Sequence, residues 1–123
     1  MRAPINLATL IIYFFFTTSP QAVENSFTGS YYMRACSAAI NMDGSMNNYL
    51  EIGDCFGSIK TILSLKEIGM ISANSGCLPS NATLDQIARV VVNIMQKNPQ
   101  IMHLPFPMIV IAAFNAAWPC QAR

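Results

Sequence analysis

The sequence contains four cysteines and one histidine, residue types that often act as nucleophiles, bases or metal ligands. A Cys–His pair would need a free thiol with a lowered pKa close to His103. A zinc site would need four ligands, but the sequence has no CxxC pair and only that one histidine. An even number of cysteines in a small exported chain instead favours two disulfides, with three pairings to choose from. We therefore expect Cys36, Cys55, Cys77 and Cys120 to be disulfide-bonded, and we expect no metal or other cofactor.

The acidic residues are spread along the chain and do not form the carboxylate pair of an acid–base catalyst. Asp54 and Asp85 are expected in the first turns of helices, where the helix dipole favours a negative charge. The sequence has no glycine-rich phosphate loop, GxSxG elbow or HExxH motif. We interpret His103 as a surface or capping residue, and the sequence does not predict an enzyme.

Residues 1–22 have the pattern of a secretory signal peptide. Arg2 gives a short positive start, Leu7 to Phe16 is an apolar run interrupted only by Thr9, and small polar residues follow. The apolar run is short for a bilayer span, although an uncleaved N-terminal anchor is the alternative interpretation. We expect residues 23–123 to form one exported domain in the periplasm, without stable membrane insertion after signal cleavage.

The charge of the expected mature domain is balanced. Without Arg2, six Lys and Arg residues face six Asp and Glu residues. Such a chain lacks the clustered basic residues that nucleic acid or anionic lipid would require. Low net charge combined with high apolar content favours association through a protein interface, so a homodimer is one expectation.

Four segments have the spacing of helices with one apolar face, and no segment has useful strand-like alternation. The expected helices are Ser30–Ala39, Tyr49–Ile68, 84–97 and Met108–Trp118. The second is expected to break near Gly53 and Asp54, with Lys60, Lys66 and Glu67 on its outer side. The third has a capping box formed by Thr83 and Gln86. The fourth is apolar nearly all round and is expected to be the most buried. The fold class is therefore all-α, a small disulfide-linked helical bundle of about four helices.

An antiparallel bundle decides which cysteines pair. Cys36 and Cys55 would lie at one pole, where the first helix ends and the second begins, and Cys77 and Cys120 at the opposite pole. The other pairings would bridge ends of helices roughly 15–25 Å apart at ~1.5 Å per residue. A disulfide tolerates only about 7 Å between Cα atoms. We therefore predict the bonds Cys36–Cys55 and Cys77–Cys120.

The chain also resembles a known family, the Rap/Tai group of type VI secretion amidase-immunity proteins. The similarity is distributed over four pieces that follow one another in the family's order. They are SFTGSYYMRAC (Ser26–Cys36), GDCFGSI (Gly53–Ile59), GCLPSNATLDQ (Gly76–Gln86) and the ending from Lys97 to Cys120. The sequence departs from the family pattern at Pro105 and Pro107, and at Ser58-Ile59-Lys60, where an aromatic residue is common.

This resemblance implies an all-helical, disulfide-bearing periplasmic protein that is often dimeric. Such proteins bind and block a peptidoglycan amidase, the toxin delivered by neighbouring cells. The implied mechanism is steric, because a loop or helix edge fills the amidase cleft and denies substrate access to its Cys–His centre.

Loops are the expected inhibitory surface, since loops project from a rigid frame and carry recognition residues. Two polar loops, Asn41–Asn48 and Met70–Asn81, are candidates, although both could be ordinary solvated connections. The candidate partner-binding residues are Asp43, Ser45, Asn47, Asn48, Asn74, Ser75 and Ser80.

The alternative function is an exported helical protein with a chaperone-like role, or one that binds an apolar ligand. Eight methionines and low charge would suit adaptable apolar contacts.

Overall fold

The computed structural model describes residues 27–42 and 48–121 of the chain. The expected signal peptide and the candidates Asp43, Ser45 and Asn47 lie outside these residues. Within them the chain forms α2 (Gly29–Asn41), α3 (Tyr49–Glu67), α4 (Leu84–Lys97) and α5 (Phe106–Ala117), with a short 3-10 helix, η3 (Pro99–Ile101). The described residues contain one isolated bridge, Thr28 with Pro105, and no strand. The all-α class is confirmed.

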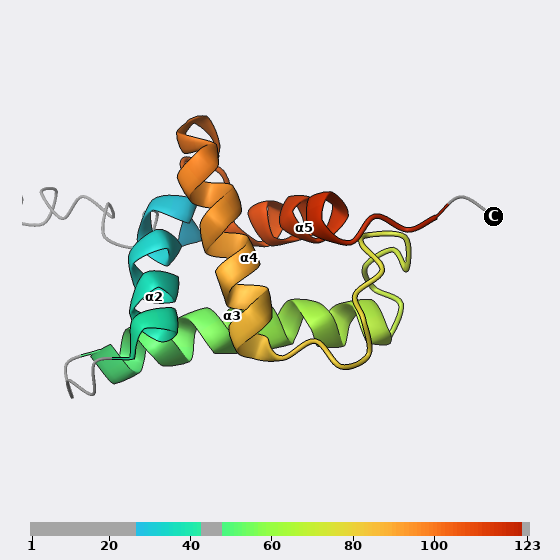
Figure 1. Ribbon diagram of the computed structural model, residues 1–123, viewed down its shortest axis with the longest axis horizontal. Coiled ribbons are helices and arrows are strands. Elements are labelled where there is room, and N and C mark those ends of the chain that lie inside the picture. Colours follow the sequence, from blue (N-terminus) through green and yellow to red (C-terminus); the bar gives the residue numbers. More distant parts are fainter. Residues whose placement is uncertain (1–26, 43–47, 122–123) are drawn as a thin grey trace, which may run out of the picture.

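The helices cross one another and do not form an up-and-down bundle. Figure 1 shows α2 and α4 running side by side in opposite directions, with α3 extending across them along the length of the molecule. Both α2 and α4 pack on α3, and α5 packs on α4 and α3. Fully buried alanines at the contacts, Ala35, Ala39 and Ala88, leave room for close crossing. The expected alignment of all four helices is therefore wrong, although the number of helices is right.

Both disulfides join the predicted partners. Cys36 and Cys55 have Cα atoms 5.0 Å apart, and those of Cys77 and Cys120 are 4.9 Å apart. Cys36 and Cys55 lie within α2 and α3, fully buried where the two helices cross, and not at helix ends. Cys36 and Cys55 therefore pair because α2 and α3 cross at these residues, and not because two helix ends meet there.

The core is apolar and is built from the stripes that the spacing predicts. Ile87, Val91 and Met95 of α4 are buried in one cluster with Cys55 and Ile59 of α3 and with the buried residues of α5. The predicted capping box starts α4, with Thr83 Oγ1 accepting from the Gln86 amide and the Gln86 side chain accepting from the Thr83 amide. For α4, both the predicted start and the predicted buried face agree with the structure.

The helix α3 is continuous through Gly53 and Asp54, where a break was expected. Asp54 is consequently a mid-helix residue, and the acid in the first turn is Glu51. Each glycine costs about 1 kcal/mol relative to alanine in a helix. Burial of Cys55, Ile59 and Ile62 on the other side of α3 offsets that cost, since a buried aliphatic side chain contributes about 1.5–3 kcal/mol.

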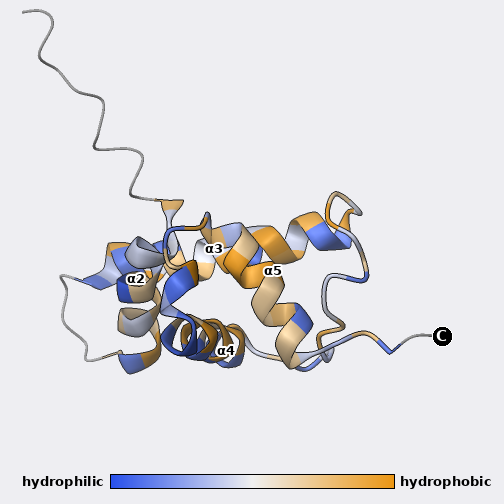
Figure 2. Cartoon of the chain, turned by 90° about the horizontal axis from the view of Figure 1, so that it is seen from above, coloured by the Kyte–Doolittle hydropathy of each residue, from blue (hydrophilic) through white to orange (hydrophobic). Residues whose placement is uncertain are grey.

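The last helix, α5, combines a deeply buried side with an exposed apolar side. Phe106 and Phe114 are the largest fully buried side chains of the described residues. On the opposite side Met108, Ala112 and Ala116 are exposed, and α5 is the most uniformly hydrophobic helix in Figure 2. The prediction of a largely buried fourth helix therefore holds for one side of it.

The start of α2 is held by the segment before α5. The amides of Gly29 and Ser30 donate to the carbonyls of Leu104 and Met102, both at 3.0 Å. These amides belong to the first turn of the helix, whose donors have no partner within the helix. Backbone carbonyls thus do the work that a side-chain cap does in α4, because Thr28 makes no side-chain cap bond.

Two polar contacts join α2 to α3 at the surface. The Tyr31 hydroxyl donates to Asp54 Oδ2, and Arg34 Nε donates to Glu51 Oε1 at 2.7 Å. The hydrogen bond to Asp54 raises the pKa of Tyr31 to about 12, with lesser contributions from burial and from the nearby negative charges. The phenol is therefore stabilised in its protonated form in the folded protein.

The titration of Tyr31 tests this contact. We expect one tyrosine of the folded protein to ionise near pH 12, measured by tyrosinate absorbance. Because the folded pKa lies above the unfolded value of about 10, the contact stabilises the fold fully below pH 10. That stabilisation is lost as the pH rises towards 12. Asp54→Asn should move the late ionisation towards pH 10, whereas Tyr49→Phe, at an exposed site, should leave it in place. An unchanged late step in Asp54→Asn would refute the assignment.

Candidate partner-binding surface

The connection between α3 and α4, residues 68–83, is the larger of the two candidate loops within the described residues, and we call it the α3–α4 loop. It begins where Gly69 adopts φ +79°, a left-handed conformation that glycine reaches without steric cost. The amides of Gly69 and Met70 then donate to the carbonyls of Lys66 and Leu65, at 3.2 and 2.9 Å. Gly69 thus ends α3, and it sets the direction in which the loop leaves the helix.

The middle of the loop is fixed to the end of α5. Cys77 is bonded to Cys120, and the Cys77 amide donates to the Trp118 carbonyl at 2.7 Å. Gly76 is buried against Phe114 with φ +81°, and a Cβ at this position would lie 2.6 Å from Phe114 Cβ. Only glycine combines that backbone conformation with so close an approach.

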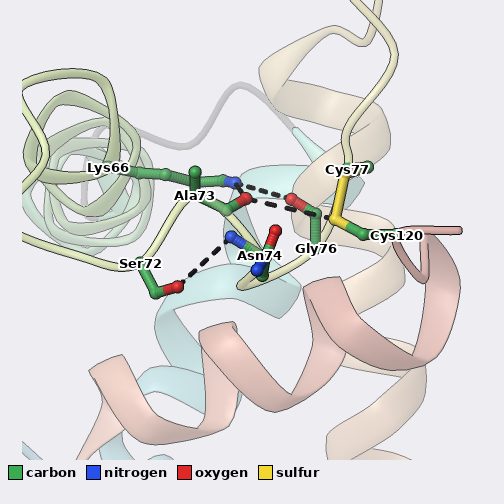
Figure 3. The surroundings of a disulfide bond; sticks show 7 residues. All are labelled: Lys66, Ser72, Ala73, Asn74, Gly76, Cys77 and Cys120. Atoms are coloured by element: carbon green, nitrogen blue, oxygen red, sulfur yellow. Dashed lines mark hydrogen bonds between the residues drawn. A yellow bond between two sulfur atoms is a disulfide. The ribbon is translucent and has the colours of Figure 1, made fainter. Parts of the chain in front are cut away.

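Lys66 holds the turn from the α3 side. Its Nζ donates to the carbonyls of Ala73 and Gly76, at 2.5 and 2.7 Å (Figure 3). The Cys120 Sγ lies 4.0 Å from the same Ala73 carbonyl oxygen, a contact without a hydrogen since the sulfur is in a disulfide. Lys66 was expected on the outer side of α3, and that expectation is wrong. A lysine near a helix C-terminus can bond free carbonyls, and this signal could have indicated its role.

The loop side chains that the sequence singled out differ in exposure. Asn74 and Ser80 are exposed, and Ser75 is half-buried. Asn74 and Ser75 lie in a turn closed by bonds from the Asn74 amide to Ser72 Oγ, at 3.3 Å, and from the Ser75 amide to the Ser72 carbonyl, at 3.0 Å. Ser80 lies in a second turn, where the Ala82 amide donates to the Pro79 carbonyl at 3.1 Å. The exposed side chains of Asn74 and Ser80 are thus each carried by a hydrogen-bonded turn.

The structure does not bring all the candidates together. Asn48 is the half-buried residue preceding α3, without a side-chain cap bond. It is separated from the α3–α4 loop by the full length of α3, roughly 28 Å at 1.5 Å per residue. The described candidates therefore lie in two separate parts of the molecule, Asn48 before α3 and the other three, Asn74, Ser75 and Ser80, in the α3–α4 loop.

No thiol is available for a Cys–His pair, because all four cysteines are in disulfides. His103 is exposed in the turn that follows η3. In the part of the chain that the structure describes, no group of His, Cys, Asp and Glu could hold a metal ion. Nor is any of the helices described long and apolar enough to cross a membrane.

Comparison with known proteins assigns the family. The model of the Rap1a immunity proteins matches residues 28–120, a range that includes all four helices and both disulfides. The chain belongs to the Rap1a immunity proteins. Membership implies an immunity protein that acts against a type VI effector, and the expectation drawn from the four sequence pieces is confirmed at that level. Neither a search of curated proteins nor a search of solved structures gave a match.

Removal of the Lys66 ammonium should loosen the loop selectively. In Lys66→Met the carbonyls of Ala73 and Gly76 lose a charged donor, an interaction worth about 1.5–3 kcal/mol per bond when buried and less at this half-exposed site. We expect faster amide hydrogen exchange in residues 72–77 with little change in the α4 core. Lys60→Met is the matched control, since Lys60 is exposed on the same helix. Equal exchange in the two variants would show that Lys66 does not hold the loop.

Proposed function

We propose that this Rap1a immunity protein binds and inhibits a peptidoglycan amidase effector by placing the α3–α4 loop in the active-site cleft of the enzyme. The inhibition is stoichiometric and steric, and it requires no chemistry from the immunity protein. It takes place in the periplasm, after removal of residues 1–22 as a signal peptide. An oxidising compartment of this kind is where structural disulfides persist.

The fixation of the loop is the observation that best supports this proposal. Loop ordering on binding costs about 0.5–1.5 kcal/mol for each immobilised side chain. Here the disulfide to Cys120, the burial of Gly76 and the two bonds from Lys66 have already ordered the backbone. Exposed polar side chains on an ordered backbone can occupy a cleft with little further loss of entropy.

A homodimer is the second part of the proposal, and the exposed side of α5 would form its interface. Met108 is 56% exposed, and Ala112 and Ala116 follow it at four-residue intervals. Residues with this spacing share one face of a helix, and small ones allow a second helix to approach closely.

Loop variants test the inhibitory surface. We expect the mature protein to co-purify with its cognate cell-wall amidase and to suppress hydrolysis of peptidoglycan. The double variant Asn74→Arg/Ser80→Arg should weaken inhibition at least tenfold, about 1.4 kcal/mol, because two bulky cations replace small contacts. The matched control is Asn93→Arg/Gln96→Arg on the exposed side of α4. Circular dichroism should show equal helicity in both.

Two results would count against the proposal in different ways. Equal inhibition by the loop and control variants would reject the loop as the inhibitory surface while leaving the amidase as the target. Failure of the unmodified protein to inhibit any co-encoded amidase would reject the target itself.

Sedimentation equilibrium tests the dimer. The unmodified protein should sediment as a dimer at micromolar concentration. Ala116→Arg should sediment as a monomer, because the interface would have to bury an unpaired charge. Gln96→Arg, at an exposed site on α4, should remain dimeric. A monomeric unmodified protein over the whole concentration range would exclude this interface.

A further inference from the structure

A groove of about 380 Å³ lies along α3 and extends to the start of α5. Gly53 and Gly57 line it from α3, and Phe27, Phe106 and Pro107 line it from outside that helix. Leu65 and Ile71 close one end, so the groove adjoins the α3–α4 loop, to which Ile71 belongs. A concave, mostly apolar surface of this size is typical of a binding site.

The packing of the described residues does not explain why Gly53 and Gly57 are glycines. Both are exposed within α3, and a Cβ built at either position meets no atom within 4 Å. Neither has a positive φ, so the backbone conformation does not require glycine. Glycine weakens a helix, and its remaining advantage here is that another chain can approach the bare backbone of α3 closely.

The groove also carries one negative charge without a cationic partner. Asp54 lies on the groove and accepts a hydrogen bond from Tyr31. The nearby Arg34 is paired instead with Glu51 at 2.7 Å, and within residues 27–42 and 48–121 no Lys, Arg or His forms an ion pair with Asp54. Ser58 and Thr61, which carry hydroxyls, also line the groove. The surface is therefore apolar with an acidic point at one side.

We propose that this groove binds a segment of a partner protein in which an arginine or lysine adjoins an apolar side chain. The basic group pairs with Asp54, and the apolar side chain enters the space above Gly57, between Phe106 and Leu65. A charge-assisted hydrogen bond to the free lone pairs of the carboxylate fixes the orientation of the segment. The site does not depend on the identity of the amidase, although its position beside Ile71 allows one partner to contact both groove and loop.

Selection from a displayed peptide library tests the groove without a known partner. The disulfide-intact mature protein is the bait, and Gly57→Leu is the counter-selection bait, because Gly57 lines the groove and a Cβ at this position meets no atom of the fold within 4 Å. We expect the peptides that prefer the unmodified protein to be enriched in arginine or lysine next to an apolar residue. Ser64→Leu is the matched control, since Ser64 is exposed on α3 but does not line the groove.

Binding by a selected peptide should then fall at least tenfold with Gly57→Leu, and about tenfold with Asp54→Asn. Ser64→Leu should bind as well as the unmodified protein. The melting temperature of Gly57→Leu should stay equal or rise, since leucine favours helix more than glycine does. A melting temperature that does not fall would show that Gly57→Leu loses binding without misfolding.

Three outcomes would overturn the proposal. One is that no peptide distinguishes the unmodified protein from Gly57→Leu. Another is that the distinguishing peptides lack basic residues, which would indicate a purely apolar ligand. The third is that Asp54→Asn leaves peptide affinity unchanged. None of these measurements involves an amidase, so failure here is distinguishable from failure of the proposed inhibition.

Discussion

The attachment of the α3–α4 loop to the end of α5 is the constraint on which the candidate surface depends. Three interactions of different strength contribute. The Cys77–Cys120 bond spans 43 residues and stabilises the fold by about 4 kcal/mol in the chain-entropy description. The bonds from Lys66 are weaker, but they select one conformation of the turn. Gly76 contributes shape, since its missing Cβ lets the backbone lie on Phe114. The disulfide keeps the loop in place, and the other two decide how it is presented.

The surface of the protein shows several features that do not serve its own stability. Leu50, Ile68 and Met70 are large apolar residues with 68–85% exposure. Helix-weakening glycines occupy the exposed side of α3, and Met108, Ala112 and Ala116 are exposed on α5. The core has no comparable defect, since no buried side-chain nitrogen or oxygen in the described residues lacks a partner. Features that reduce stability at the surface of a well-packed domain are typical of recognition.

The sequence predicts those parts of the fold that depend on neighbouring residues. The capping box of Thr83 and Gln86 and the buried stripe of α4 are both local signals, and both are confirmed. The disulfide pairing was also predicted correctly, although the helices cross and do not form the expected antiparallel bundle. In the structure the first bond forms where α2 crosses α3, and the second forms where the α3–α4 loop meets the end of α5.

The remainder could not be predicted because it depends on tertiary contacts. Gly53 suggested a break in α3, but packing of Cys55 and Ile59 on the core overrides the local preference of a glycine. Lys66 was expected to face solvent, and its carbonyl partners lie seven and ten residues further along a loop whose path the sequence does not fix. The groove is assembled from α3, Phe27, the start of α5 and the loop, and no single segment carries a signal for it.

The order of the disulfides along the chain has a consequence for biosynthesis. Each cysteine is bonded to the next one in sequence, Cys36 to Cys55 and Cys77 to Cys120. An oxidase that joins cysteines as they emerge, N-terminal end first, therefore makes the native bonds directly. Of the three pairings open to four cysteines, only this one is reached without reshuffling by thiol–disulfide exchange. In a compartment with such an oxidase, this pairing would require no isomerase.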